Sequence, residues 1–300
     1  MDFGDKLKEI RKNEGLSQEQ LAERIGVSRQ AITKWETGRG LPDVENMVIL
    51  AEIFKMTLDE LVLQEKKLQE KKAAVFESET VYDIDCGKHF DIHMGSARKI
   101  VLCSGTDEKL HVKLESEVLE NLNSLFKIKL DEKNKKIDID CLRKKGISRY
   151  ETEDSVDVII TLPENYTNHC ELAASTKELI IEGLKLQHLE YDGDAKRVLI
   201  QDCVGSLEFT SKTDYDITIE GVCTQLDINQ WMAKTVVHVA DLDVYKVINK
   251  GRKCNIYYQK NGNVCDEHDS EGGEYVISVS GIGSELLIDC GMHRSAGWDV

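Results

Sequence analysis

Two short apolar runs recur at a nearly constant interval in the second half of the chain, and this spacing restricts the fold more than any other feature. The runs of the first set are evenly spaced and begin at Ile180, Leu199, Thr218 and Val237. Those of the second set keep the same interval, apart from a first step that is one residue shorter, and begin at Leu189, Leu207, Leu226 and Tyr245. Two short strands per turn of constant length are typical of a β-solenoid, whose stacked coils share one apolar interior. Hairpins stacked in an antiparallel sandwich would give a similar spacing, so that alternative stays open.

Alternating apolar and polar residues predict further strands before the repeat. These runs are Asp91–Met94, Lys99–Leu102, Leu110–Leu114, Phe126–Leu130 and Val156–Ile160. Gly, Asn, Asp or Lys turns bound each of them. The sequence therefore predicts an all-β domain over residues 79–300, with a β-solenoid as its architecture.

The charge of the chain is divided unevenly. The whole chain has a net charge of −16, but residues 1–72 contain 13 Lys and Arg against 14 Asp and Glu, a net of −1. The remainder contains 26 against 41, a net of −15. The first part is thus electrostatically free to approach phosphates, whereas the second would be repelled by them. We expect an α + β multidomain protein.

Helical periodicity predicts five short helices within residues 1–63. Ser17 and Gln20 have the spacing of a capping box, Gly26 supplies a helix stop, and Ser28 is a suitable N-cap for the next helix. Pro42 and Asp43 open a fourth helix. The last helix begins at Thr57, with Glu60 again at the capping-box spacing.

The third helix, from about Ser28 to Glu36, points to a function. At 100° per residue, Ala31, Ile32 and Trp35 fall on one side. The opposite side carries side chains that suit the DNA major groove, where Arg recognises guanine, Gln recognises adenine and Lys serves a base or a phosphate. They are Arg29, Gln30, Thr33 and Lys34. Gln18, in the first turn of the second helix, is placed to reach a phosphate together with backbone N–H groups.

Residues 3–63 resemble the helix-turn-helix of the Cro/CI (XRE) family of bacterial and phage repressors. The segments that carry the resemblance are Leu16–Ala22, Gly26–Ser28 and Ile32–Gly38. The resemblance implies that Gln18 contacts phosphate, that Arg39 in the following loop does so too, and that Ile32 and Trp35 are packing residues. It assigns groove reading to Ser28, Arg29, Gln30, Thr33 and Lys34. It also implies a structural ion pair between Arg11 and Glu36.

The sequence predicts a charged linker over residues 64–78. Leu61, Leu68 and Val75 are seven residues apart, which would suit a coiled coil, but the companion positions are polar and favour a solvated tether. The region after residue 79 resembles, in its style of repeat only, the adhesin-like β-solenoid domains appended to helix-turn-helix regulators of Firmicutes.

Enzymatic, metal and membrane functions receive little support. The sequence has no nucleophile-elbow, phosphate-loop, zinc-protease or dinucleotide-binding motif, so no enzyme and no cofactor are expected. Cys86, His89, His93 and Cys103, and separately Cys265 and His268, are metal-binding residue types without metal-site spacing. Cys203, Cys223 and Cys254 are expected to pack inside the repeat. Carboxylates recur in register with the repeat and indicate an outward, solvated row: Glu182, Glu190, Glu208, Glu220 and Asp227.

These observations predict a sequence-specific DNA-binding transcriptional regulator. Its expected partner is double-stranded operator DNA, bound as a homodimer, with a protein or small-molecule effector at the acidic β-domain. Nine single cysteines, no secretory leader and no apolar run long enough for a membrane span lead us to expect a cytoplasmic protein. Two alternatives remain: a β-solenoid that acts on or binds carbohydrate, and a protein-interaction module, each with an accessory helix-turn-helix.

Overall fold

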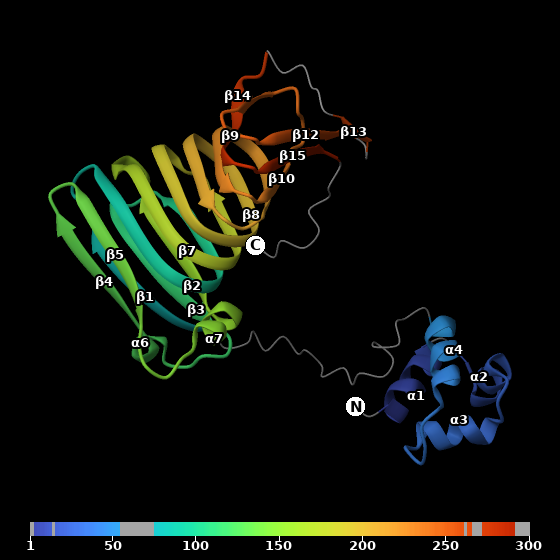
Figure 1. Cartoon of the computed structure of the whole chain (residues 1–300). Helices are drawn as coiled ribbons and strands as arrows, with labels where there is room; N and C mark the ends of the chain where they lie inside the picture. Colours follow the sequence, from blue (N-terminus) through green and yellow to red (C-terminus); the bar gives the residue numbers. More distant parts are fainter. Residues whose placement is uncertain (1–2, 14–15, 55–74, 261–262, 266–271, 292–300) are drawn as a thin grey trace. The chain divides into compact units, whose positions relative to one another are not determined.

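The computed structural model describes residues 3–13, 16–54, 75–260, 263–265 and 272–291. The chain divides into two compact units, residues 1–73 and residues 74–300. The first unit is helical, and the second consists almost entirely of strands (Figure 1).

Four helices form the described part of the first unit. They are α1 (Phe3–Asn13), α2 (Gln18–Ile25), α3 (Arg29–Glu36) and α4 (Val44–Phe54). The predicted fifth helix, from Thr57, lies outside the described residues, as does most of the predicted linker.

Two short α-helices that the sequence did not predict belong to the second unit. They are α6 (Leu122–Leu125) and α7 (Arg149–Ser155), and a 3-10 turn follows at Glu164–Tyr166. The described residues therefore contain six α-helices, and the expected count of five is wrong. The helix α7 is too short and too polar to show helical periodicity, although Ser148 and Glu151 do form a capping box at its start.

Side-chain caps set the ends of α2 and α3 as predicted. Ser17 Oγ accepts from the Gln20 N–H at 3.1 Å, and Gln20 Oε1 accepts from the Ser17 N–H at 2.8 Å. Gly26, with φ at 81°, ends α2 in the left-handed conformation that glycine tolerates best. Ser28 Oγ then accepts from the Ala31 N–H at 3.2 Å and starts α3. Each of these cap hydrogen bonds joins residues three positions apart, so local sequence determines where the two helices start.

One apolar cluster holds the four helices together. Leu7, Leu21, Ile32 and Leu50, one from each helix, are fully buried, and Trp35 is buried beside them. This confirms that Ile32 and Trp35 are packing residues. Because they fix the inner side of α3, the opposite side of the helix faces outward.

Fifteen strands are described in the second unit. They are β1 (Phe76–Asp83), β2 (Lys88–Gly105), β3 (Lys109–Ser116), β4 (Phe126–Lys133), β5 (Lys136–Arg143), β6 (Asp157–Pro163), β7 (Thr167–Glu182), β8 (Lys185–Ser211), β9 (Tyr215–Trp231), β10 (Lys234–His238), β11 (Tyr245–Asn249), β12 (Asn255–Lys260), β13 (Asn263–Cys265), β14 (Tyr275–Ile282) and β15 (Glu285–Cys290). The strands predicted before the repeat fall in β2, β3, β4 and β6. However, β1 begins at Phe76, inside the segment that was predicted to be linker.

The strands join in one sheet whose main path runs β1-β3-β6-β2-β7-β8-β9-β10-β15-β12-β13. The hairpin β4–β5 joins this path through β5 and β2, and β14 joins it through β9. In Figure 1 the long strands β2, β7, β8 and β9 lie side by side. Their mutual pairing is parallel.

The interval of the sequence repeat equals the separation in sequence between paired residues of neighbouring parallel strands. Cys170 pairs with Leu189, Leu199 with Thr218, and Leu207 with Leu226, each at the interval that separates the runs of the first set. Consecutive hairpins would instead pair antiparallel, so the described pairing of β7, β8 and β9 does not have the geometry of the sandwich alternative.

The repeat ends earlier than predicted. Val237 pairs with Ile217 rather than with Thr218, because the stretch from Gln230 to Thr235 is one residue longer than the stretch from Ser211 to Tyr215 beside it. Tyr245 does not continue the second set either: Leu226 pairs with Ile277 of β14, whereas Tyr245 pairs with Tyr275. A later segment of the chain therefore occupies the place that the sequence assigned to β11.

The interior of the second unit contains the apolar members of the repeat. Tyr191, Phe209 and Tyr215 pack as an aromatic cluster, with ring centroids 5.5 to 6.4 Å apart. The cysteines of the repeat are buried, as expected: Cys203, Cys223 and Cys254. Of the carboxylates that recur with the repeat, only Glu182 is exposed, so the prediction of a solvated row is met in part. The others are half-buried: Glu190, Glu208, Glu220 and Asp227.

Candidate nucleic-acid interface

The outward side of α3 carries the residues that the sequence selected for groove reading. Arg29, Gln30, Thr33 and Lys34 are all exposed. Ser28 is exposed as well, with its hydroxyl oxygen accepting from the N–H of Ala31 as the N-cap. The structure thus brings these residues to one face, anchored from behind by Ile32 and Trp35.

Positive charge on this face is uncompensated. In the described part of the first unit, none of Arg29, Lys34 and Arg39 has an acidic partner, and α3 has no acidic residue in its first turn. Arg39 lies exposed just beyond the end of α3. Lys34 lies against the loop after α3, where a Cβ on Gly40 would be 3.2 Å from Lys34 Cε. The face therefore offers cationic groups to an anionic ligand.

Gln18 has a second role that sequence reasoning missed. Its Nε2 donates to Glu36 Oε2 at 2.8 Å, and its Oε1 accepts from Thr33 Oγ1 at 3.3 Å. The side chain thus links the start of α2 to two positions on α3, while one amide hydrogen remains for an outside acceptor. No local sequence pattern predicts this hydrogen bond, because Gln18 and Glu36 are 18 residues apart.

Arg11 and Glu36 are paired as the family resemblance implies. Arg11 Nε donates to Glu36 Oε1 at 2.6 Å, and Nη2 donates to Oε2 at 3.1 Å. Arg11 Nη1 also donates to the carbonyl of Leu16 at 2.6 Å. Both side chains are buried, and the hydrogen bond to the Glu36 carboxylate raises the pKa of Arg11. The pair holds α1, the turn after it and α3 in a fixed relation.

The weaker chemical candidates are dispersed. His89 lies 3.1 Å from Glu171 and stacks on His169, whereas His93 lies 3.6 Å from Asp91. Within the described residues, no group of three or more His, Cys, Asp or Glu side chains is placed to hold a metal ion. The structure describes the backbone of Cys265, whereas His268 lies outside the described residues. No helix of the described part of the chain has the length and apolarity needed to cross a bilayer.

Comparison with known proteins places the first unit among regulators. The family model described as Helix-turn-helix matches residues 7–61. The HTH-type transcriptional activator BcrR of Enterococcus faecalis is 46% identical over 66 residues, which are 22% of this chain and 32% of that protein. The cryptic phage CTXphi transcriptional repressor RstR of Vibrio cholerae is 38% identical over 61 residues, 20% of this chain and 54% of that protein. The chain thus spans only about a third of BcrR and about half of RstR.

Two solved structures are similar to parts of this chain. The P22 c2 repressor protein in complex with a synthetic operator has 28% identity and a TM-score of 0.21, over 21% of this chain and 96% of that one. A putative cell adhesion protein from Clostridium sporogenes has 13% identity and a TM-score of 0.32, over 72% of this chain and 99% of that one.

A further relative is matched over most of its length. The uncharacterized HTH-type transcriptional regulator YqaE of Bacillus subtilis is 30% identical over 103 residues, 33% of this chain and 89% of that protein. Together with the capped helix pair and the buried ion pair of the first unit, this match shows that the chain belongs to the helix-turn-helix transcriptional regulators of the XRE (Cro/CI) type.

Proposed function

We propose that this protein regulates transcription by binding double-stranded operator DNA with α3 in the major groove. The observation that carries the proposal is the exposed row of Arg29, Gln30, Thr33 and Lys34, held outward by the buried Ile32 and Trp35. A helix with this division presents hydrogen-bonding and cationic groups to base edges and leaves its packing unchanged.

Each residue of the interface has a role in this proposal. Arg29 recognises guanine through two hydrogen bonds, Gln30 recognises adenine, and Thr33 and Lys34 contact bases or adjacent phosphates. Ser28 starts the helix at the groove, while Gln18 and Arg39 bind the phosphates on either side. The known relatives include one named an activator and one named a repressor, which supports regulation without fixing its direction.

The second unit has a separate part in the proposal. The parallel pairing at the interval of the sequence repeat supports a β-solenoid, which dimerises the protein, senses an effector or binds a partner. Its strong negative charge keeps it off the duplex, so that DNA contact is confined to the first unit. We propose no catalytic role for it and place the whole protein in the cytoplasm.

The experiment that tests this function is selection of binding sites from a random duplex library by the full chain. We expect one enriched inverted repeat, with half-sites about one helical turn apart, if two copies bind together. The variant Arg29→Ala should select a different or degenerate base at one position of each half-site. Lys12→Ala, at an exposed position of α1, is the matched control and should select the wild-type sequence.

Two results would contradict the proposal. If the wild-type chain enriches no sequence, then it does not read DNA unaided. If Arg29→Ala retains the wild-type preference at every position, then α3 is not the reading helix in the assigned orientation.

A further inference from the structure

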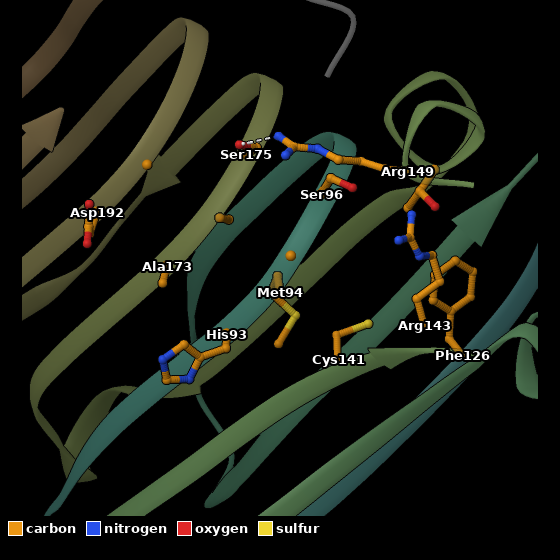
Figure 2. Close-up of a pocket in the computed structure, with 14 residues that line it drawn as sticks. His93, Met94, Ser96, Phe126, Cys141, Arg143, Arg149, Ala173, Ser175 and Asp192 are labelled. Carbon is orange, nitrogen blue, oxygen red and sulfur yellow. Dashed lines mark hydrogen bonds between the residues drawn. The ribbon is translucent and has the colours of Figure 1, made fainter. Parts of the chain in front are cut away.

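A cavity opens in the second unit where β5 separates from β2. The two strands pair only between His89 and His93 of β2, and from Lys99 onward β2 pairs with β6 instead. Between these stretches the pairing of β2 with β7 shifts register after His93. Gly95, at this shift, has a φ of 69° that bends β2. The cavity lies at this bend beside α7 and has a volume of about 470 Å³, within the range of small-molecule clefts (Figure 2).

The inner part of the cavity is apolar and uncharged. Met94 and Phe126 are almost completely buried there, and small side chains such as Ala173 leave the space open. Cys141 also lines it, and burial raises the pKa of its thiol to about 11, so that it is neutral near pH 7. Figure 2 shows Met94 and Cys141 close together in the inner part of the cavity.

Two arginines give one end of the cavity a positive charge. Arg149 reaches over from α7, where its Nη2 donates to Ser175 Oγ at 3.0 Å and its Nε donates to Glu153 at 2.6 Å. Arg143 is exposed at the end of β5, paired across the hairpin with Phe126, and has no acidic partner in the described part of the chain. A guanidinium beside an apolar hollow can bind a carboxylate or phosphate through two parallel hydrogen bonds.

The other end of the cavity has acidic groups. Asp192 lines it, and the nitrogens of His93 lie 3.6 Å from Asp91 and 3.7 Å from Asp140. Charge therefore changes along the cavity, which fixes the direction in which a ligand with one charged end would enter.

We propose that this cavity binds a small organic anion, with its carboxylate or phosphate on Arg143 and its apolar body against Met94 and Phe126. The proposal supplies a ligand class for the sensing role proposed above. Binding itself does not depend on DNA recognition, so it is measured on the full chain without DNA, and a failure of either proposal leaves the other to be judged separately.

The test uses methyl NMR of the full chain carrying ¹³C-labelled methionine, with the Met94 signal assigned by Met94→Leu. Sodium octanoate and octyl phosphate are the anionic probes, and 1-octanol is the neutral probe of equal chain length. We expect an anionic probe to shift the Met94 methyl signal saturably and to leave Met232, which is outside the cavity, unchanged. Response to only one of the two anions also supports the proposal and identifies the acid group.

A matched pair of variants tests the role of Arg143. Arg143→Gln should weaken binding of the active probe by about tenfold or more, the usual effect of losing a hydrogen bond to a charged group. Arg252→Gln, at an exposed arginine outside the cavity, should bind as the wild type does. Equal binding of 1-octanol, unchanged binding by Arg143→Gln, or no shift of Met94 with either anion would each overturn the proposal.

Discussion

The Nε2 of Gln18 donates to the Oε2 of Glu36 across 2.8 Å and so ties the first turn of α2 to the last turn of α3. The same carboxylate receives two hydrogen bonds from Arg11 of α1. Three helices therefore meet at one buried group. The orientation of the proposed reading helix depends on that group as well as on apolar packing.

We predict that Glu36→Gln destabilises the first unit by about 3 kcal/mol, because it leaves the buried Arg11 guanidinium without a counter-charge. Hydrogen exchange of the α3 amides in the full chain measures the effect, and exchange should accelerate throughout α3. Glu23→Gln, at an exposed position of α2, is the control and should leave the exchange rates close to those of the wild type. Unchanged protection of α3 in Glu36→Gln would show that the ion pair is not needed to hold the helix.

Gly4 should tolerate no side chain. A Cβ there would lie 2.5 Å from the carbonyl oxygen of Trp35, so Gly4→Ala forces α1 away from α3 and should cost about 1–3 kcal/mol. The loss of stability should appear as faster hydrogen exchange of the backbone amides of α1 and α3. Gly40→Ala provides the comparison, since the nearest atom is the flexible Cε of Lys34 at 3.2 Å, and it should have a much smaller effect. An equally small effect of Gly4→Ala would mean that the helices are not packed this closely.

His111 should make the anchoring of β1 depend on pH. Its ring nitrogens lie 2.9 Å from Asp107 and 2.9 Å from Glu79, and these hydrogen bonds, with that of Asp107 the stronger, raise the pKa of His111 above 6.5. A histidine with a raised pKa in the folded state contributes its full stabilisation below the unfolded value of about 6.5. That stabilisation is lost as the pH rises through the folded value.

The melting temperature measures this dependence. The difference between the wild type and His111→Gln should be largest near pH 6 and should shrink by pH 9. Lys113→Gln is the matched control, because Lys113 also joins β1 to β3, with its Nζ 2.9 Å from Glu77, but has a pKa raised above 10.5. The difference in melting temperature between the wild type and Lys113→Gln should stay constant between pH 6 and pH 9. A His111→Gln difference that does not change with pH would contradict the assignment.

Arg39 should contribute affinity without sequence preference. Because the proposal places Arg39 on a phosphate, Arg39→Gln should weaken binding to all duplexes alike and should lower the salt dependence of binding by about one counterion. Fluorescence anisotropy at several salt concentrations measures this slope, and Lys12→Gln should leave it unchanged. A change in the preferred sequence would instead place Arg39 on a base edge.

Short-range chemistry explains what could be predicted in the first unit. The caps of Ser17 and Ser28 act on N–H groups three residues away, and Gly26 ends α2 through its own φ angle. Such features depend on few neighbours, so the sequence determined where α2 and α3 begin and end, and which side of α3 is buried. The period of the strand repeat was visible for a related reason: β7, β8 and β9 pair with one another at the same residue interval.

Contacts between distant residues were decided only by the tertiary structure. The link from Gln18 to Glu36, the approach of Gly4 to Trp35 and the place of β14 beside β9 join segments that no local pattern connects. The cavity beside Arg143 exists because β5 and β6 share β2 as a neighbour along different parts of its length. Pairing of this kind depends on which arrangement buries the whole apolar set best, and that choice is made by the complete fold and not by any one segment.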